Sequence, residues 1–303
     1  MVKIIIVNYN SDKWIARCLF SIHQAGLIDH TIIVDNASTD NSVLFIEQNF
    51  PRAELIKLSA NLGFGHANNI GIKKADEQDA DYVFLMNQDV YIEPNTINYL
   101  IKVAQLNPDF GIISPMHLNG SGSELDFSFS NYIVPFKCNK LYSDIFLQKT
   151  APLYELHFVN AAAWLVTRKC IEKVGGFNPS FYHYAEDCNY CQRVLYHGLK
   201  IGIAPEAVIY HDRENRTENK YFDNTALLHE RKLIMLFSDP FNNEKSTGKL
   251  YLDYCKMMMK SLITFRLKAF KEHYHKIKIC HSLDWKMIFH NRKQSVDKGK
   301  NFL

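Results

Sequence analysis

The first 118 residues alternate short apolar runs with segments in which apolar residues recur every three or four positions. Five runs have the pattern of strands: KIIIVNY, TIIVDNA, AELIKL, DYVFLMN and GIISPMH. The segments between them predict helices that begin near Asp12, near Ser38, within NLGFGHANNIG and after Pro94. Continuous apolar strands separated by helices predict a mostly parallel sheet covered on both faces, and right-handed crossovers make it doubly wound. We therefore expect an α/β fold.

The second half is less regular. Residues 119–156 are rich in Gly, Ser, Asn and isolated aromatic residues, which predicts a long excursion such as a lid or acceptor loop. HFVNAAAWLVTRKC then predicts a strand and a short helix, FYHYAEDCNYCQRVLY predicts an aromatic loop that feeds a helix, and IGIAP and AVIYHD predict two strands. Residues 249–271 predict one amphipathic helix, whose apolar face carries Tyr251, Cys255, Met258, Leu262, Phe265 and Ala269.

Composition adds an asymmetry of charge. The chain has 303 residues, of which 47% are hydrophobic and 22% charged, as in an ordinary globular protein. From Lys245 to Leu303 there are 14 Lys and Arg against 4 Asp and Glu, so this segment carries +10 and the preceding residues carry −7 of the net +3. Seven cysteines without a secretory leader predict a reduced, cytoplasmic protein. No apolar stretch approaches the roughly 20 residues that span a bilayer.

The basic segment has three interpretations. Its apolar stripe packs on the body of the protein, or it lies on the anionic cytoplasmic face of the inner membrane as a peripheral contact, near a lipid-linked acceptor. The third interpretation, binding to nucleic acid, is not expected because no nucleic-acid fold signature accompanies the charge.

Polar residues follow several of the predicted strands. NYN, DNASTD and NQD each end an apolar run, and ligands of such sheets bind at the carboxyl ends of the strands. Asp35 is a candidate acceptor for the imide N–H of a uracil or thymine ring, although Asp and Asn are also common in turns and helix caps. NLGFGHANNIG lets the backbone approach a ligand, but it is neither a dinucleotide fingerprint nor a P-loop, and it also suits a plain strand-to-helix loop.

Three positions are candidates for catalysis or metal binding. Asp89 is a suitable ligand for Mg²⁺ or Mn²⁺ if a second ligand exists, and His211 also ends a strand. Asp187 follows an aromatic run at a helix start, where a carboxylate acts either as a general base or as favourable capping charge. The alternative for His211 is a histidine satisfied near the surface. Cys188 and Cys191 lack a second pair at zinc spacing.

The motifs IIIVNYN, IIVDNASTDNS, NLGFGHANNIG, FLMNQDV, VGGFNPSFYHYAEDCNYCQR and VIYHD occur in an order that resembles a family 2 glycosyltransferase. The similarity covers about residues 1–240 and is to the branch containing bacterial rhamnosyltransferases and related cell-surface polysaccharide enzymes. The resemblance implies a GT-A fold with a nucleotide-binding half, residues 1–118, and an acceptor-side, catalytic half with a mixed sheet, residues 119–240. Residues 241–303 would form a basic helical C-terminal extension.

The resemblance also implies an inverting transfer of one sugar, rhamnose or a hexose, from a UDP- or dTDP-sugar to a hydroxyl of a cell-surface glycan or lipid-linked precursor. QRVLY lacks the Q-x-x-R-W pattern of processive synthases. Asp187 would be the catalytic base, supported by Glu186, and Asp89 and His211 would hold Mg²⁺ or Mn²⁺. The residues implied to bind the nucleotide sugar are Asn8, Tyr9, Asn10, Asp35, Asn36, Asn61, Gly63, Asn68, Asn69, Asn87 and Gln88.

Two positions depart from the family pattern. Asn87 replaces the first acid of the family's D-x-D motif, as is usual in this branch, and Gln88 stands where the branch often has proline. The metal therefore has fewer charged ligands. A nucleotidyltransferase is an alternative function, but its Gly-rich basic loop near the first strand is absent. A non-catalytic nucleotide-sugar-binding protein is another, against which the retained Asp187, Asp89 and His211 argue.

Overall fold

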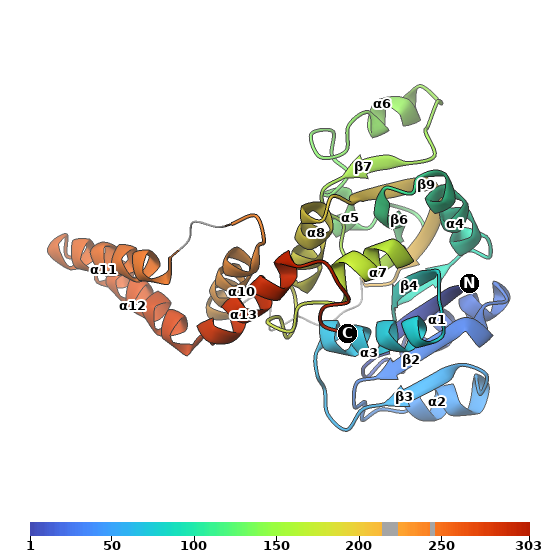
Figure 1. Ribbon diagram of the computed structural model, residues 1–303, viewed down its shortest axis with the longest axis horizontal. Helices are drawn as coiled ribbons and strands as arrows, with labels where there is room; N and C mark the ends of the chain where they lie inside the picture. The colour runs from blue at the N-terminus through green and yellow to red at the C-terminus, as the bar shows by residue number, and fades with distance from the viewer. Residues whose placement is uncertain (214–223, 243–245) are drawn as a thin grey trace. The chain divides into compact units, whose positions relative to one another are not determined.

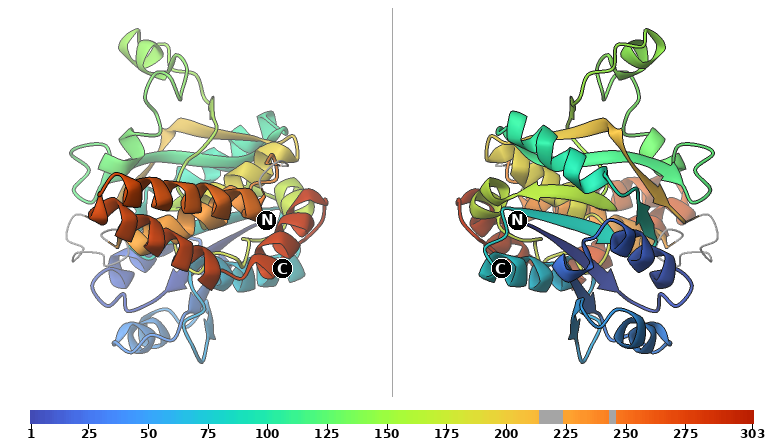
Figure 2. Two further views of the ribbon diagram at one scale, coloured as in Figure 1. Left: turned by 90° about the vertical axis from the view of Figure 1, so that its left-hand side faces the viewer. Right: turned by 90° about the vertical axis from the view of Figure 1, so that its right-hand side faces the viewer.

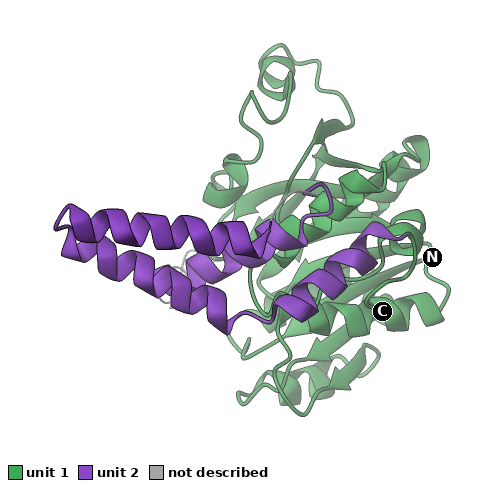
Figure 3. Ribbon diagram, turned by 60° about the vertical axis from the view of Figure 1, so that its left-hand side comes forward, with its two compact units in different colours: residues 1–215, 298–303 green, residues 216–297 purple. Residues whose placement is uncertain are grey.

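The computed structural model describes residues 1–213, 224–242 and 246–303 (Figure 1). The chain divides into two compact units, one of residues 1–215 and 298–303 and the other of residues 216–297 (Figure 3). Helix α10 (Thr225–Ser238) belongs to the second unit, whereas the sequence analysis grouped it with the catalytic domain.

The first unit is built on a nine-stranded mixed sheet in the order β3-β2-β1-β4-β8-β6-β9-β5, with β7 paired to β9. Its strands are β1 (Val2–Asn8), β2 (Thr31–Asp35), β3 (Glu54–Lys57), β4 (Tyr82–Asn87), β5 (Val90–Ile92), β6 (Phe110–Asn119), β7 (Tyr154–Leu156), β8 (Ala163–Thr167) and β9 (Lys200–His211). Strands β1 to β4 are parallel, whereas β8 is antiparallel to both β4 and β6. The prediction of a mostly parallel sheet with a mixed acceptor-side half is confirmed.

Helices cover both faces of this sheet, as the apolar runs predicted. The helices described in the first unit are α1 (Ile15–Gln24), α2 (Ser42–Asn49), α3 (Phe64–Glu77), α4 (Thr96–Leu106), α5 (Phe127–Ser130), α6 (Leu141–Phe146), α7 (Arg168–Val174) and α8 (Glu186–Tyr196), with a short 3₁₀ helix η1 (Ile28–His30). Successive residues of β1 point to opposite faces, so Ile5 joins one core with Ala67 of α3, while Ile4 and Ile6 join the other with Ile15 of α1.

Two predicted strands are in fact one. IGIAP and AVIYHD form the continuous β9, because an irregularity in its pairing with β6 absorbs Pro205: Pro115 pairs with Ala204, and the next residue, Met116, pairs with Val208. The three-residue strand β5 was not predicted. The excursion after β6 contains α5, α6 and β7, and its α6 part projects beyond the sheet (Figure 2).

The last six residues of the chain belong to the first unit. Lys300 makes an ion pair with Asp76 of α3 at 2.7 Å, and the ring of Phe302 lies 4.8 Å from the guanidinium carbon of Arg193. Arg193 is fully buried and donates hydrogen bonds to the carbonyls of Val174 and Gly176. The chain end thus supports the segment that follows α7, which leads to the start of α8.

Among the described residues, the second unit contains α10, α11 (Thr247–Ile263), α12 (Leu267–Ser282) and α13 (Trp285–Val296). The prediction of one helix over residues 249–271 is wrong, because α11 ends at Ile263 and the chain reverses at Phe265, whose φ of 55° is left-handed. Figure 3 shows α11 and α12 side by side. Across the described ranges, no helix combines the length and apolar character needed to cross a membrane.

Candidate active site

The carboxyl ends of β1 and β2 carry a buried hydrogen-bonded pair. Asn8 and Asp35 are partners in the strand register, and the Asn8 Nδ2 donates to Asp35 Oδ1 at 2.7 Å. The same amide nitrogen lies 2.9 Å from the Oγ of Ser42, and the second Asp35 oxygen accepts from the Ser38 N–H at 3.2 Å. Asn8 is completely buried and Asp35 is 3% exposed. Asn8 therefore holds the orientation of the Asp35 carboxylate.

The loop after β1 is tied to the loop after β4. Gln88 accepts from the Tyr9 N–H at 2.7 Å and donates to the Tyr9 carbonyl at 3.1 Å. Asn10 adopts a left-handed φ of 47°, and its side chain accepts from the Thr39 N–H at 2.8 Å. The phenol of Tyr9 remains largely exposed. These contacts fix the rim where β1, β2 and β4 end.

Asn36 and Asn61 shape the loop that precedes α3. Asn36 donates to Asn61 Oδ1 at 2.9 Å and accepts from the Leu62 N–H at 2.8 Å, while Asn61 Oδ1 also accepts from the Gly63 N–H at 2.9 Å. Gly63 has a φ of +85°, and a Cβ on it would lie 2.1 Å from the carbonyl oxygen of Tyr182. The loop is therefore pressed against the segment that leads to α8, and only glycine fits there.

The other two asparagines of NLGFGHANNIG, Asn68 and Asn69, form hydrogen bonds with backbone groups in the protein interior. Asn68 donates to the Phe64 carbonyl at 3.0 Å. Asn69 donates to the Phe177 carbonyl at 2.8 Å and accepts from the Phe177 N–H at 2.6 Å. Asn69 thus connects α3 to the segment between α7 and α8.

Asp89 and His211 are brought together by the pairing of β5 with β9. Val90 lies opposite His211 in this antiparallel pair, and the Asp212 N–H donates to the Asp89 carbonyl at 2.9 Å. The His211 Nε2 lies 3.5 Å from Asp89 Oδ1, and each residue is 1% exposed. Close by in sequence, the buried Oδ1 of Asn87 has no hydrogen-bond partner among the described residues. A carboxylate, an imidazole and an amide oxygen are donors that suit Mg²⁺ or Mn²⁺.

The sequence analysis missed Asp126, which lies on the other side of His211. Its Oδ2 is 3.5 Å from His211 Nδ1, and Arg213 Nη1 is 3.4 Å from Oδ1. Asp126 also caps α5, because the Phe129 N–H donates to its carboxylate at 2.8 Å. A carboxylate on the far nitrogen of a metal-binding histidine fixes its tautomer and ring orientation. The only signal in the sequence was an acid three residues before a short aromatic turn.

His117 stacks on Phe129 and packs beside His211, with ring centroids 4.3 Å and 6.2 Å away. Burial, together with the charges of His211 and Arg213, holds the pKa of His117 well below its usual range, so it is neutral near pH 7. A pocket of about 290 Å³ opens beside this cluster. It is lined by Asn119, Glu124, Leu125, Asp126, Phe127, Ser128, His211 and Arg213.

Glu186 and Asp187 form the first turn of α8, directly after two left-handed residues, Tyr184 (φ 68°) and Ala185 (φ 71°). Two consecutive non-glycine residues in this conformation mark a locally strained backbone of the kind found at functional sites. Burial raises the pKa of Asp187, while hydrogen bonds from the backbone N–H groups of Cys188 and Ala161 lower it in part. Glu186 is 5% exposed.

Tyr132 is a half-buried tyrosine in the excursion after β6. Burial and the nearby Asp187 carboxylate raise the pKa of Tyr132 to about 12, and the charges of Arg213 and Asp126 also act on it. Its ring packs edge-on against Phe158 at 4.9 Å. The excursion after β6 therefore supplies Asp126 and Tyr132 to a rim whose other groups come from the strand ends.

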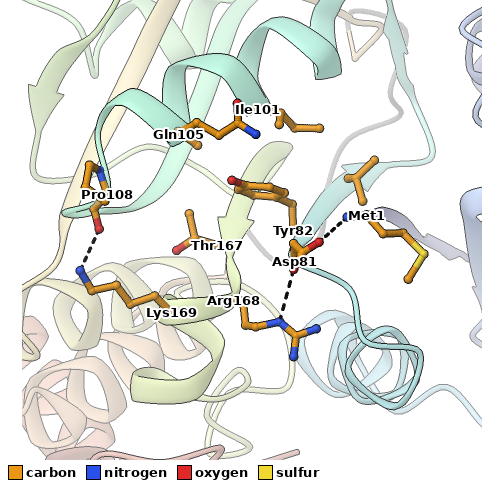
Figure 4. A pocket seen from close by; sticks show the side chains of 11 residues that line it. Met1, Asp81, Tyr82, Ile101, Gln105, Pro108, Thr167, Arg168 and Lys169 are labelled. Atoms are coloured by element: carbon orange, nitrogen blue, oxygen red, sulfur yellow. Dashed lines mark hydrogen bonds and ion pairs between the residues drawn. The ribbon is translucent and has the colours of Figure 1, made fainter.

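A larger pocket, of about 580 Å³, lies away from this rim (Figure 4). It is near the amino ends of β1 and β4, where the N-terminal amino group and Arg168 both make ion pairs with Asp81. Lys169 donates to the Pro108 carbonyl at 2.8 Å. No predicted site residue lines this pocket, which is at the edge of the sheet opposite to the one where ligands of such folds bind.

The sequence of this chain is similar to those of known proteins. A family model described as "Glycosyl transferase family 2" matches residues 3–175. The N-acetylglucosaminyl-diphospho-decaprenol L-rhamnosyltransferase of Mycobacterium tuberculosis is 24% identical over 257 residues, covering 78% of this chain and 84% of that protein. The rhamnosyltransferase WbbL of Escherichia coli K12 is 25% identical over 237 residues, covering 72% and 86%.

Solved structures agree on the fold. The mannosyltransferase PcManGT from Pyrobaculum calidifontis, in complex with GDP-Man and Mn²⁺, superposes with a TM-score of 0.57 at 15% identity, covering 97% of this chain and 73% of that one. S. aureus TarS 1-349 in complex with UDP gives a TM-score of 0.55 at 14% identity, covering 81% and 67%. The GT-A fold expected from the sequence is thereby confirmed.

The contact between the Gly63 loop and Tyr182 leads to a stability prediction. Gly63→Ala should lower the free energy of unfolding by about 3 kcal/mol, since alanine at this positive φ with a ψ of 167° costs about 1–3 kcal/mol and overpacking adds about 1–3 kcal/mol. Gly26→Ala is the matched control, because Gly26 has a φ of +72° with nothing within 4 Å of an added Cβ. Urea unfolding of both variants measures the difference, and equal losses would show that the Tyr182 contact is unimportant.

Proposed function

Because the chain belongs to glycosyl transferase family 2, we propose that it catalyses one inverting transfer of a sugar from a UDP- or dTDP-sugar to a hydroxyl of a cell-surface glycan or lipid-linked precursor. It is a glycosyltransferase, and the names of its relatives favour rhamnose or another hexose as the sugar moved. One observation carries the mechanism: the two nitrogens of His211 lie 3.5 Å from Asp89 and 3.5 Å from Asp126, all three side chains being buried.

The donor would bind along the rim formed by β1, β2 and β4. In this proposal the Asp35 carboxylate, oriented by Asn8, accepts a hydrogen bond from the imide N–H of the base. Tyr9, Asn10, Asn36, Asn61 and Gly63 belong to the braced loops around it. Gln88 would contribute by holding the Tyr9 loop, and Asn68 and Asn69 by bonding to the backbone of Phe64 and Phe177.

Asp187 would act on the acceptor. It takes the proton from the attacking hydroxyl, whose oxygen forms a bond to the anomeric carbon as the bond to the diphosphate breaks on the opposite side. Burial raises the pKa of Asp187, which strengthens it as a base. Glu186, adjacent and buried, would support its position.

Asp89 and His211 would hold a Mg²⁺ or Mn²⁺ ion, with the neutral Asn87 nearby. The donor set and the unpartnered Asn87 oxygen fit such an ion, and two related folds were crystallised with Mn²⁺. In the described ranges no three His, Cys, Asp or Glu residues form a metal cluster, so donor phosphate oxygens would have to supply further ligands. When bound, the ion would neutralise charge on the leaving diphosphate.

A nucleotide-sugar panel tests the function. Purified protein with Mn²⁺ or Mg²⁺ should hydrolyse at least one UDP- or dTDP-sugar slowly and release the nucleoside diphosphate. Release of pyrophosphate from a nucleoside triphosphate and a sugar phosphate would instead indicate a nucleotidyltransferase. Donor binding without either reaction would indicate a non-catalytic protein.

Asp187→Asn should reduce kcat about 10²- to 10⁴-fold, the range expected for loss of a general base, with donor affinity nearly unchanged. In the wild type, kcat should fall as the pH drops through the pKa of Asp187. Because burial raises that pKa, the fall should begin at a higher pH than for an exposed aspartate. Steady-state transfer and nucleotide binding measure both effects, and near-normal transfer by the variant would remove Asp187 as the base.

Asp126→Asn should weaken Mn²⁺ binding by about 10- to 100-fold, as expected when the outer carboxylate of a metal-binding histidine is lost. Asparagine retains the cap on α5, so the fold should be kept. Glu124→Gln, an exposed acid of the same pocket, is the control and should bind normally. Titration of Mn²⁺ in the presence of UDP, followed by electron paramagnetic resonance, measures the affinity without turnover. Equal affinities in both variants would contradict the role of Asp126.

A further inference from the structure

The turn between α11 and α12 displays a cluster of apolar side chains. Ile263, Phe265 and Leu267 are 72%, 89% and 65% exposed, and Leu262 beside them is 47% exposed. Phe265 has the highest exposed fraction among the large hydrophobic residues that the structure describes. Side chains this exposed gain nothing from the protein core, so their apolar character is unexplained by folding.

The backbone holds this cluster in place. The Phe265 N–H donates to the Leu262 carbonyl at 3.0 Å, and the Arg266 N–H donates to the Ser261 carbonyl at 2.8 Å. These bonds close a turn in which Phe265 has a φ of 55°, a conformation that is costly for a bulky side chain. A glycine or asparagine would suit that position better, yet the chain has a phenylalanine whose side chain is exposed to solvent.

Cations surround the apolar residues. Lys260, Arg266 and Lys268 are all exposed and alternate with the apolar residues of the turn. From residue 247 to 282 the sequence has eight Lys and Arg against two acids, Asp253 and Glu272. A nucleic acid would use the charge but not the exposed Phe265, whereas an anionic bilayer surface uses both, because apolar tips enter the interface while lysine and arginine meet the lipid phosphates.

We propose that the α11–α12 turn, residues 262–268, inserts into the interface of an anionic membrane and anchors the enzyme there as a monotopic protein. The contact is the tip of a helical hairpin, not one long helix lying flat as the sequence pattern suggested. The inference deepens the proposed function, since an interfacial anchor suits an enzyme whose acceptor is lipid-linked.

The tip makes a specific prediction about vesicle binding by the full-length chain. Phe265→Ser should weaken partitioning into vesicles of phosphatidylcholine and 30% phosphatidylglycerol by about tenfold, the effect of removing one large apolar residue from the interface. The double variant Ile263→Ser/Phe265→Ser should weaken it by about 100-fold. Pure phosphatidylcholine should bind the wild type poorly because a zwitterionic surface has no net negative charge to attract the cations.

Leu252→Ser is the matched control. Leu252 lies on α11, is 53% exposed and is ten residues before the start of the turn, so its loss should change partitioning less than twofold. Vesicle flotation measures all variants, and thermal unfolding checks that each remains folded. Equal losses for Leu252→Ser and Phe265→Ser would overturn tip insertion in favour of a helix lying flat.

Two further outcomes also count against the proposal. If Phe265→Ser binds vesicles as the wild type does, the tip is not the anchor. If the wild type does not bind vesicles but forms a dimer, and the Phe265→Ser variant is a monomer, the tip is a protein interface. Donor hydrolysis without vesicles should be equal in the wild type and Phe265→Ser. If the wild type itself hydrolyses no donor, the proposed function is refuted, whereas the vesicle experiment still tests membrane binding by the turn.

Discussion

The antiparallel pairing of β5 with β9 is the constraint on which the candidate site depends. It places Val90 opposite His211, so Asp89 meets a histidine that is 122 positions later in the chain. Neither strand end alone could hold a divalent ion. A second pairing, of β9 with β6, places Asn119 opposite His211, and the excursion that follows β6 brings Asp126 to the other nitrogen of the His211 ring. Displacing this register by one residue would turn the imidazole to the opposite face of the sheet.

Around this pair the rim is stiffened mainly by amide side chains. Asn8 orients Asp35. The Gln88 side chain bonds to the backbone N–H and carbonyl of Tyr9, and the Asn69 side chain bonds to the backbone N–H and carbonyl of Phe177. Gln88 is instructive, because a proline at this position could make neither side-chain hydrogen bond. A preorganised rim reduces the ordering cost of binding a donor. The strained backbone at Tyr184 and Ala185 also contributes to this preorganisation, because it lies directly before the acids of α8.

The sequence predicted the architecture well because continuous apolar strands and helical periodicity are local signals. It also identified the polar strand ends, since ligands of parallel sheets gather at one edge. Asp126 could not be found this way, because it lies in an aperiodic segment and its role depends on a contact with distant His211. An asparagine that faces a ligand and one that braces a loop look the same in sequence. The break after Ile263 was hidden because Phe265 turns the chain without glycine or proline.

The central claim is that Asp89 and His211 would hold a divalent ion at the donor diphosphate, with Asp187 as the base. Crystals grown with UDP or dTDP and Mn²⁺, measured at the manganese absorption edge, test it most directly. The account predicts one anomalous peak in contact with Asp89, His211 and the diphosphate oxygens. A bound nucleotide with manganese elsewhere, or with the diphosphate away from these two residues, would contradict it.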